Sequence, residues 1–297
     1  MNYNFSIIII GYNSLATLKK LLSSIKQLNA DNIILEIIYV DDGSTDGSYD
    51  YFQSYKLPFK IIPVKLATNH GRAYATNKGI QSANGDWFLL IQSNMTVRPN
   101  LLQHYAKAIF TNNALIFTGT IQYKSTDIVF QNYLNHKNRG INAYKEFEKV
   151  HYSHLLFGNC IIHKSIFQEI KLNLKLDAYG GEELDFAYRA LQKFPNAIIA
   201  YPKAQVVRIQ FPILTTHCLR LEEYGHKNLK LLSPFLQKQV VKFPQLFFNI
   251  PFYLRWLISF LYYIGKKIYT IPYFSRSIIR LVLGLAILKG YYNKKAK

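Results

Sequence analysis

Apolar and amphipathic segments alternate along roughly the first 120 residues of the chain. Short, mainly apolar runs occupy residues 5–10, 33–40, 59–64 and 87–91. Between them, residues 15–28, 48–55 and 72–82 carry apolar side chains at helical spacing. Strands that alternate with helices of this length form sheets that are covered by helices on both faces. The pattern therefore predicts an α/β fold with a doubly wound, mostly parallel sheet.

The same pattern continues to about residue 212. Pro99 suits the first turn of a helix that ends near Thr111, and residues 115–118 are expected to form a strand. Residues 122–151 are polar, aromatic and irregular, which we interpret as an insertion over the site rather than a separate domain. A strand, a helix and a strand are then expected in residues 157–167, 180–192 and 197–209. Residues 1–212 thus form the predicted first domain.

The character of the sequence changes after Phe211. Residues 243–264 and 278–288 are strongly apolar and aromatic, but Pro244, Asn249, Pro251 and Arg255 interrupt the first stretch. Neither stretch reaches the ~18–20 clean apolar residues that a membrane span needs. We expect residues 213–297 to be a basic, amphipathic helical extension. Two interpretations remain open: helices that lie in a membrane interface, or helices that pack on the first domain with a solvated basic face.

The charge is strongly positive, and its distribution narrows the choice of partners. The chain has 36 Lys and Arg against 17 Asp and Glu, a formal net charge of +19, and no acid follows Glu223. A basic tail favours anionic lipid or a phosphorylated substrate. Nucleic acid is not expected, because the basic residues are interleaved with long aliphatic stretches and no nucleic-acid-binding module is recognisable.

The cellular compartment is suggested by the cysteines and by the first residues. Cys160 and Cys218 are too few for a disulfide framework or a zinc cluster, so both are expected to be reduced and buried. The first apolar run leads into a polar turn without a basic region before it, as in a strand rather than a signal peptide. We expect a cytoplasmic protein that is peripheral at the cytoplasmic face of the membrane.

Acidic residues follow the second predicted strand, at Asp41, Asp42 and Asp46. Carboxylates at the carboxyl end of a strand can accept hydrogen bonds from a nucleobase N–H or from ribose hydroxyls. We expect Asp42 to be such a ligand. An ordinary capped turn needs only one acid, and Asp46 is interpreted as that cap.

Small residues follow the third predicted strand, between Asn69 and Gly79. They let a helix approach the sheet and a ligand closely, and Arg72 and Lys78 bring positive charge that would suit a diphosphate. The alternative is that the small residues serve packing alone.

The central apolar run at residues 87–91 is typical of a strand that is buried on both faces. Gln92, Ser93 and Asn94 follow it at the edge where ligands bind to open α/β sheets. Later in the chain, Glu182, Glu183 and Asp185 lie within one turn at the start of a predicted helix, where the helix dipole favours anions. The plainer interpretation is that these acids pair with Arg189, four residues after Asp185.

Together and in this order, these segments resemble family 2 inverting glycosyltransferases of the GT-A fold, of the bacterial surface-polysaccharide type. The resemblance covers about residues 5–210 and extends weakly to residues 224–229. It implies that Asp42 binds the base of a nucleotide sugar and that Glu183 is the general base, with Glu182 and Asp185 as the next candidates. The remaining nucleotide-sugar-binding residues that it implies are Ile10, Tyr12, Asp41, Asn69, Gly71, Arg72, Gln92, Ser93, Asn94 and Arg208.

Two departures from the family pattern concern metal binding. Family members usually carry Asp-x-Asp where this chain has Gln92-Ser93-Asn94, and commonly a His where it has Arg208. Neutral oxygens are poor ligands for a hard dication, whereas a guanidinium can neutralise a diphosphate directly. No cofactor is therefore expected, although Mg²⁺ or Mn²⁺ stays an alternative. The alternative interpretation of Arg208 is a surface residue at a strand end.

The sequence thus predicts a glycosyltransferase that is metal-independent. It would move a sugar, with inversion, from a nucleotide-sugar donor to a saccharide or lipid-linked acceptor in surface glycan assembly. The anionic membrane surface is its expected partner. The alternative is a catalytically silent GT-A-like protein that binds a partner or serves as a scaffold.

Overall fold

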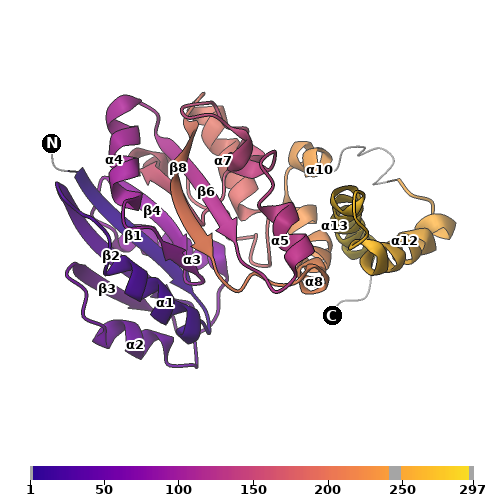
Figure 1. Ribbon diagram of the computed structural model, residues 1–297, viewed down its shortest axis with the longest axis horizontal. Helices are drawn as coiled ribbons and strands as arrows, with labels where there is room; N and C mark the ends of the chain where they lie inside the picture. The colour runs from indigo at the N-terminus through magenta and orange to yellow at the C-terminus, as the bar shows by residue number, and fades with distance from the viewer. Residues whose placement is uncertain (1–2, 241–248, 294–297) are drawn as a thin grey trace.

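The computed structural model describes residues 3–240 and 249–293, which are arranged as Figure 1 shows. The strands and helices expected in the first 111 residues are confirmed, with small shifts at their ends, and the structure adds the short strand β5, which was not expected. In chain order they are β1 (Tyr3–Gly11), α1 (Leu15–Ile25), β2 (Ile33–Asp41), α2 (Ser48–Ser54), β3 (Lys60–Lys65), α3 (Arg72–Ser82), β4 (Trp87–Gln92), β5 (Met95–Val97) and α4 (Leu101–Thr111).

The middle of the chain completes the sheet. Its elements are β6 (Ile116–Tyr123), α5 (Ile128–Leu134), two short 3₁₀ helices η1 (Gly140–Ala143) and η2 (Tyr152–His154), β7 (Cys160–His163), α6 (Lys164–Glu169), α7 (Glu182–Lys193) and β8 (Ile198–Arg208). The eight strands follow the order β3-β2-β1-β4-β7-β6-β8-β5. β1 runs parallel to β2 and β4, β2 to β3, and β6 to β8, while β7 and β5 run antiparallel to their neighbours. The predicted mixed, mostly parallel α/β sheet is confirmed.

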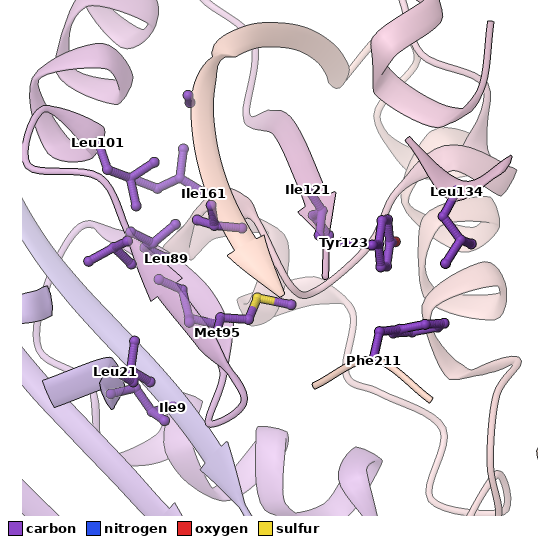
Figure 2. Close-up of a cluster of buried hydrophobic side chains, with 14 of the residues drawn as sticks. Ile9, Leu21, Leu89, Met95, Leu101, Ile121, Tyr123, Leu134, Ile161 and Phe211 are labelled. Atoms are coloured by element: carbon purple, nitrogen blue, oxygen red, sulfur yellow. The ribbon is translucent and has the colours of Figure 1, made fainter. Parts of the chain in front are cut away.

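Burial on both faces of the sheet explains the apolar runs of the central strands. In β1, Ile7 and Ile9 pack toward Leu21 of α1, whereas Ile8 packs on the other face with Ala73 of α3. Figure 2 shows the first of these clusters, with Met95 lying among side chains from β1, α1 and β4. Cys160 and Cys218 are buried and not bonded to each other, as expected.

The structure corrects or extends three expectations for the middle of the chain. Residues 157–167 are not one strand, because the ring of His163 accepts the N–H of Ser165 and begins helix α6 after β7. The strand expected at 115–118 continues to Tyr123 through a register shift at Gly119. Residues 122–151 are not wholly irregular, since the carboxylate of Asp127 accepts the N–H of Phe130 at 2.9 Å and caps α5.

The C-terminal part is helical, as expected. It comprises α8 (Leu214–His226), α9 (Asn228–Leu231), α10 (Pro234–Val240), the 3₁₀ helix η3 (Phe252–Leu254), α12 (Arg255–Ile268) and α13 (Ser275–Tyr292). Residues 243–248 of the predicted apolar stretch lie outside the described residues. In Figure 1, α12 and α13 lie at the opposite end of the molecule from β2 and β3. Within the described ranges, no helix combines the length and the apolar character that a bilayer crossing demands.

The C-terminal helices pack on the first domain rather than standing apart from it. The Asp127 carboxylate accepts the N–H of Leu214 at 3.1 Å and the hydroxyl of Tyr269 at 2.8 Å. Helices α8 and α13 touch backbone to backbone, because a Cβ on Gly225 or Gly290 would collide with a carbonyl of the other helix. The packing on the first domain that we left open as an alternative is observed for α13, whose Ile279, Val282 and Leu285 join the same hydrophobic cluster as Ile7 of β1.

Candidate functional site

The carboxyl ends of β1, β2 and β4 border a cleft of about 650 Å³, here called the strand-end cleft. Loops before α3 and α7 and the helix α8 form its other walls. It is lined by Ile10, Gly11, Tyr12, Asn13, Ser14, Thr17, Asp42, Asn69, Gly71, Arg72, Gln92, Ser93, Asn94, Asp177, Ala178, Tyr179, Gln210, Arg220 and Glu223. All the predicted nucleotide-sugar-binding residues lie here except Asp41 and Arg208.

Asp41 lies behind the cleft wall. Its buried carboxylate accepts the N–H of Ser44 at 3.0 Å and is 3.3 Å from the hydroxyl of Tyr39. These contacts stabilise the turn after β2, so Asp41 supports the wall of the cleft without lining it. Asp46 also stays outside the cleft, where it accepts the N–H groups of Leu15 at 2.8 Å and Ser48 at 3.0 Å. It therefore caps the starts of two helices, α1 and α2.

Asp42 fixes the loop that leads into α3. Its two carboxylate oxygens accept the N–H groups of His70 and Gly71, each at 2.9 Å. Gly71 has φ +84°, and a Cβ there would meet the carbonyl of Asp177, so this loop needs a glycine. Burial raises the pKa of Asp42, although the two N–H groups oppose that rise. Each carboxylate oxygen can accept a further hydrogen bond, and Asp42 lines the strand-end cleft.

The triplet Gln92, Ser93 and Asn94 forms the connection between β4 and β5. The N–H of Ser93 donates to the carbonyl of Ile10 at 3.1 Å, and the carbonyl of Asn94 accepts the N–H of Ile209 at 3.0 Å. The side-chain Oδ1 of Asn94 is buried and has no hydrogen-bond partner. It is an acceptor without a donor, as a site for a ligand hydroxyl or N–H would be.

The triplet Gln92, Ser93 and Asn94 does not fit Mg²⁺ or Mn²⁺, the ions that the fold family implies. The triplet offers only amide and hydroxyl oxygens, and the guanidinium of Arg72 lies in the same wall. Among residues 3–240 and 249–293, no group of three or more His, Cys, Asp or Glu side chains could hold a metal ion. The unpartnered Asn94 oxygen alone is too weak a ligand for a hard dication.

A second cleft of about 310 Å³, here called the Glu183 cleft, adjoins the first and shares Arg72, Gln92 and Tyr179 with it. Residues from the 122–151 segment line it, so this insertion does lie over the site. The full lining is Arg72, Gln92, Ile121, Tyr123, Leu134, Arg139, Gly140, Ser153, His154, Leu156, Gly158, Tyr179, Gly180, Glu183, Arg208, Phe211 and His217.

Glu183 is the carboxylate that the first turn of α7 presents to this cleft. Its Oε1 accepts the N–H of Phe157 at 3.2 Å. Burial raises the pKa of Glu183 to about 7; the charge of Glu182 adds to this rise, while Arg72, the Phe157 N–H and Arg208 oppose it. A carboxylate with a pKa near neutrality can take a proton from a hydroxyl and release it again.

The two neighbouring acids have other partners. Glu182 is buried, with 2% of its side chain exposed, and forms an ion pair with Arg72. This pairing orients Arg72, whose guanidinium carbon lies 5.2 Å from the ring centroid of Tyr179. Asp185 accepts hydrogen bonds from Arg189 at 2.9 and 2.7 Å and lines neither cleft, in agreement with the plainer interpretation of that acid.

Arg208 ends β8 opposite Met95 of β5 and lines the Glu183 cleft rather than the strand-end cleft. Its guanidinium carbon lies 4.9 Å from the ring centroid of Phe211. The Nε atom is buried and has no hydrogen-bond partner, and burial lowers the pKa of the group. Arg208 is therefore an inward-facing residue, not a surface residue at a strand end.

Sequence reasoning missed several residues that line the clefts. Tyr179 lies between Arg72 and Arg220, whose guanidinium carbons are 5.2 and 5.7 Å from its ring centroid. Arg139 and His217 line the Glu183 cleft, where burial lowers the pKa of His217 to about 3. Tyr179 immediately precedes the glycine pair before α7, which could have drawn attention to it. Arg220 has no such signal, because it lies on α8, outside the motifs that carried the resemblance.

Comparison with known proteins identifies the family. The model of the family described as Glycosyl transferase family 2 matches residues 6–171, more than half of the chain. The chain belongs to this family. The resemblance inferred from the motifs is thereby confirmed.

The relatives agree with that assignment. The chain is 27% identical to EpsH of Bacillus subtilis over 253 residues, which cover 78% of this chain and 69% of EpsH. It is 32% identical to the uncharacterized glycosyltransferase YfnE of the same organism over 114 residues, 38% of this chain and only 29% of YfnE. It is 28% identical to the succinoglycan biosynthesis protein ExoO of Rhizobium meliloti over 120 residues, 40% of this chain and 34% of ExoO. The chain thus spans about a third of YfnE and ExoO.

Solved structures support the fold. The structure of S. aureus TarS 1–349 in complex with UDP-GlcNAc superposes with a TM-score of 0.60 at 16% identity, covering 96% of this chain and 90% of that one. A second structure of the same protein, in complex with UDP, gives a TM-score of 0.56. At this identity the likeness concerns the fold alone.

Proposed function

We propose that this protein is an inverting glycosyltransferase that holds a nucleotide sugar in the strand-end cleft and an acceptor in the Glu183 cleft. The observation that carries the proposal is the junction of the two clefts at Arg72, Gln92 and Tyr179, with the carboxylate of Glu183 in the wall of the second. A donor in one cleft and a hydroxyl in the other would meet beside a group that can accept a proton.

The reaction is a single displacement. Glu183 takes the proton of the acceptor hydroxyl while that oxygen bonds to the anomeric carbon. The bond from the anomeric carbon to the diphosphate oxygen breaks at the same time, and its electron pair leaves with the nucleoside diphosphate. Because the carboxylate acts as a base and forms no bond to the sugar, one displacement inverts the anomeric centre. The pKa of Glu183, about 7, suits this role at neutral pH.

Charge on the leaving diphosphate would be balanced by arginine rather than by metal. Arg72 borders both clefts, and Arg208 lies in the Glu183 cleft with a buried Nε that has no partner. A guanidinium can donate two parallel hydrogen bonds to phosphate oxygens and needs no further ligands. The metal-independent mechanism that the triplet suggested therefore stays our proposal.

The donor class rests on the relatives. TarS, which shares the fold, has been solved with UDP-GlcNAc and with UDP. ExoO is named as a protein of succinoglycan biosynthesis. These names support a nucleotide sugar as the donor and a saccharide or lipid-linked saccharide of surface glycan assembly as the acceptor.

We also propose that α12 attaches the protein to an anionic membrane surface. Trp256, Phe260 and Tyr263 recur at helical spacing along one face of α12 and are 62%, 51% and 56% exposed. The opposite face, with Ile258 and Tyr262, is buried. Lys266 and Lys267 lie in the last turn of the helix, and no acid follows Glu223 in the chain. Exposed aromatic side chains beside lysines suit the interface of an anionic bilayer.

Calorimetric titration tests the proposed activity. Wild-type protein is titrated with UDP, GDP, CDP, ADP and dTDP and with their sugars, once in EDTA and once in Mn²⁺. Binding of a nucleotide in EDTA, followed by transfer to a lipid-linked or free saccharide, is the expected result. Binding that occurs only with Mn²⁺ would refute the metal-independent mechanism. Absence of binding under both conditions would favour a catalytically silent scaffold.

Vesicle sedimentation tests the membrane proposal with a matched control. Replacement of Trp256, Phe260 and Tyr263 by Ser should release the protein from vesicles that contain phosphatidylglycerol at low salt. Phe110, which is 77% exposed on α4, supplies the control, because Phe110→Ser removes an exposed aromatic ring far along the chain from α12. Each basic group near such a surface contributes about 1 kcal/mol, so added salt should weaken attachment as well. Wild-type protein that stays in the supernatant would overturn this proposal.

A further inference from the structure

Arg220 brings a cation into the strand-end cleft from outside the region that the family model matches. It lies on α8, beyond residue 171 and beyond the predicted first domain. Within the described ranges, Arg72 and Arg220 are the two Lys or Arg residues that line this cleft. Both guanidinium groups lie against the ring of Tyr179. Positive charge thus enters the cleft from α3 on one side and from α8 on the other.

The two arginines differ in their partners. Arg72 is ion-paired with the buried carboxylate of Glu182. For Arg220 the described residues supply the ring of Tyr179 but neither a hydrogen bond nor an ion pair, although its side chain is half-buried. Glu223 of α8 lines the same cleft, but its Oε1 pairs with the Nζ of Lys227 at 3.4 Å. A half-buried guanidinium without a counter-charge is ready to bind an anion.

The position of Arg220 is set by the packing of α8. Gly225 lies against the carbonyl of Ile287 and Gly290 against that of Glu222, so α8 and α13 touch through their backbones. An ion pair of 2.7 Å between Lys289 and Glu222 joins the same two helices. The start of α8 is tied to α5 through the hydrogen bond from Leu214 to Asp127. Arg220 therefore projects from a helix that is held on both sides.

We propose that Arg220 binds the diphosphate of the donor, so that the C-terminal helices complete the donor site. This inference rests on the proposed function and goes beyond it, because it moves the principal diphosphate contact from the first domain to α8. Arg208, which lines the Glu183 cleft, would then act on charge at the junction rather than on the bound nucleotide. The triplet after β4 has no carboxylate that could hold a metal ion. The guanidinium of Arg220 would supply the positive charge that such an ion would otherwise bring to the diphosphate.

The experiment compares ligands that differ only in their phosphates. From the panel UDP, GDP, CDP, ADP and dTDP, the diphosphate that binds wild-type protein in EDTA is chosen, with its monophosphate and its nucleoside. Arg220→Gln is expected to weaken binding of the diphosphate roughly 10–100-fold, as loss of a hydrogen bond to a charged group does. Binding of the nucleoside should not change, and Arg220→Lys should retain part of the affinity.

Two further variants control for general charge and for folding. Arg280→Gln removes a cation from an exposed position on α13 and should leave all three affinities unchanged. Glu223→Gln removes the negative charge that faces the same cleft and should tighten diphosphate binding. Thermal melts identify any variant that has not folded, in which case the lysine and Glu223 variants decide the result.

The outcomes separate the two proposals. Diphosphate binding by Arg220→Gln that equals wild type would overturn the role of Arg220 and leave the proposed function standing. An equal loss for the nucleoside would also overturn it, since that result points to a structural role. If wild-type protein binds no nucleotide of the panel, the proposed function fails and the inference fails with it.

Discussion

The two clefts of this protein differ in how their carboxylates are held before any ligand binds. In the strand-end cleft, Asp42 accepts two backbone N–H groups, one on each oxygen. In the Glu183 cleft, Glu183 accepts the single N–H of Phe157, and burial raises its pKa to about 7. A carboxylate with a pKa near neutrality can exchange a proton at the pH at which the enzyme works. The difference supports the proposed division, with binding in the first cleft and proton transfer in the second.

The largest expected effect comes from removing the base. Glu183→Gln should lower the rate of transfer by roughly 10²–10⁴-fold, because general base catalysis contributes about that much. Nucleotide affinity should stay near that of wild type, since Glu183 lines the Glu183 cleft and not the strand-end cleft. Transfer assays and calorimetry on the same preparation measure both quantities.

Asp185→Asn is the matched control, since Asp185 lies on the same helix but outside both clefts. It should weaken the contact with Arg189 and lower the melting temperature while transfer continues. Unchanged turnover in folded Glu183→Gln protein would break the division between the clefts, because proton transfer would then have to come from elsewhere.

The next effect is a dependence of the rate on pH. Because the pKa of Glu183 is raised to about 7, the base is protonated below that pH, and kcat/KM should fall about tenfold per pH unit. Above pH 8 it should be constant. Arg208 helps to hold this pKa down, so Arg208→Ala should move the acid limb of the profile to higher pH. A pH–rate profile without an acid limb would contradict the assignment of Glu183.

The same shift has a consequence for stability. A raised pKa in the folded state means that protonated Glu183 is preferred there, so its contribution to stability is present below its ordinary pKa of 4.5 and is lost as pH rises through about 7. Glu183→Gln removes this titration. The unfolding free energy of the variant minus that of wild type should therefore be larger at pH 8 than at pH 4. Urea denaturation of both proteins at the two pH values measures this difference.

A third effect concerns the helix that carries Arg220. Gly225→Ala should lower the free energy of unfolding by about 1–3 kcal/mol, because the new Cβ would collide with the carbonyl of Ile287. Gly284→Ala on α13 is the matched control: nothing lies within 4 Å of a Cβ there, so it should be neutral or stabilise the helix by up to about 1 kcal/mol. Diphosphate affinity should fall only in the first variant. Equal behaviour of the two variants would remove the link between helix packing and the strand-end cleft.

The sequence predicted the strand-end cleft better than the Glu183 cleft, for a physical reason. Residues such as Asp42 and Gln92 follow apolar runs that form parallel strands, and the carboxyl ends of such strands meet at one edge by geometry alone. The three-residue strand β5 escaped notice because it is too short to show a period.

The Glu183 cleft depends on contacts between distant segments. Arg139 comes from the 122–151 insertion and His217 from α8, and neither segment has a repeating pattern that would place it beside α7. The pairing of Glu182 with Arg72 likewise joins residues that are 110 positions apart in the chain. Such pairings follow from packing, so the spacing of the residues left three candidate acids, and only the family resemblance put Glu183 first.

The smallest expected effect is the sharpest check on metal use. Asn94→Asp restores the last acid of the family triplet, yet we expect Mn²⁺ to change nucleotide affinity no more than a few-fold, because one carboxylate is too few ligands for a hard dication. Arg208 pairs with Met95, the residue that follows Asn94, and its positive charge opposes the binding of a cation there.

The double variant Asn94→Asp, Arg208→His removes that charge and adds a ligand, so any response to Mn²⁺ should appear in it first. Titrations with Mn²⁺ and with EDTA compare the two. A strong response to Mn²⁺ in Asn94→Asp alone would show that the strand-end cleft is a metal site that lacks a single carboxylate, and the exchange of metal for arginine would then be wrong.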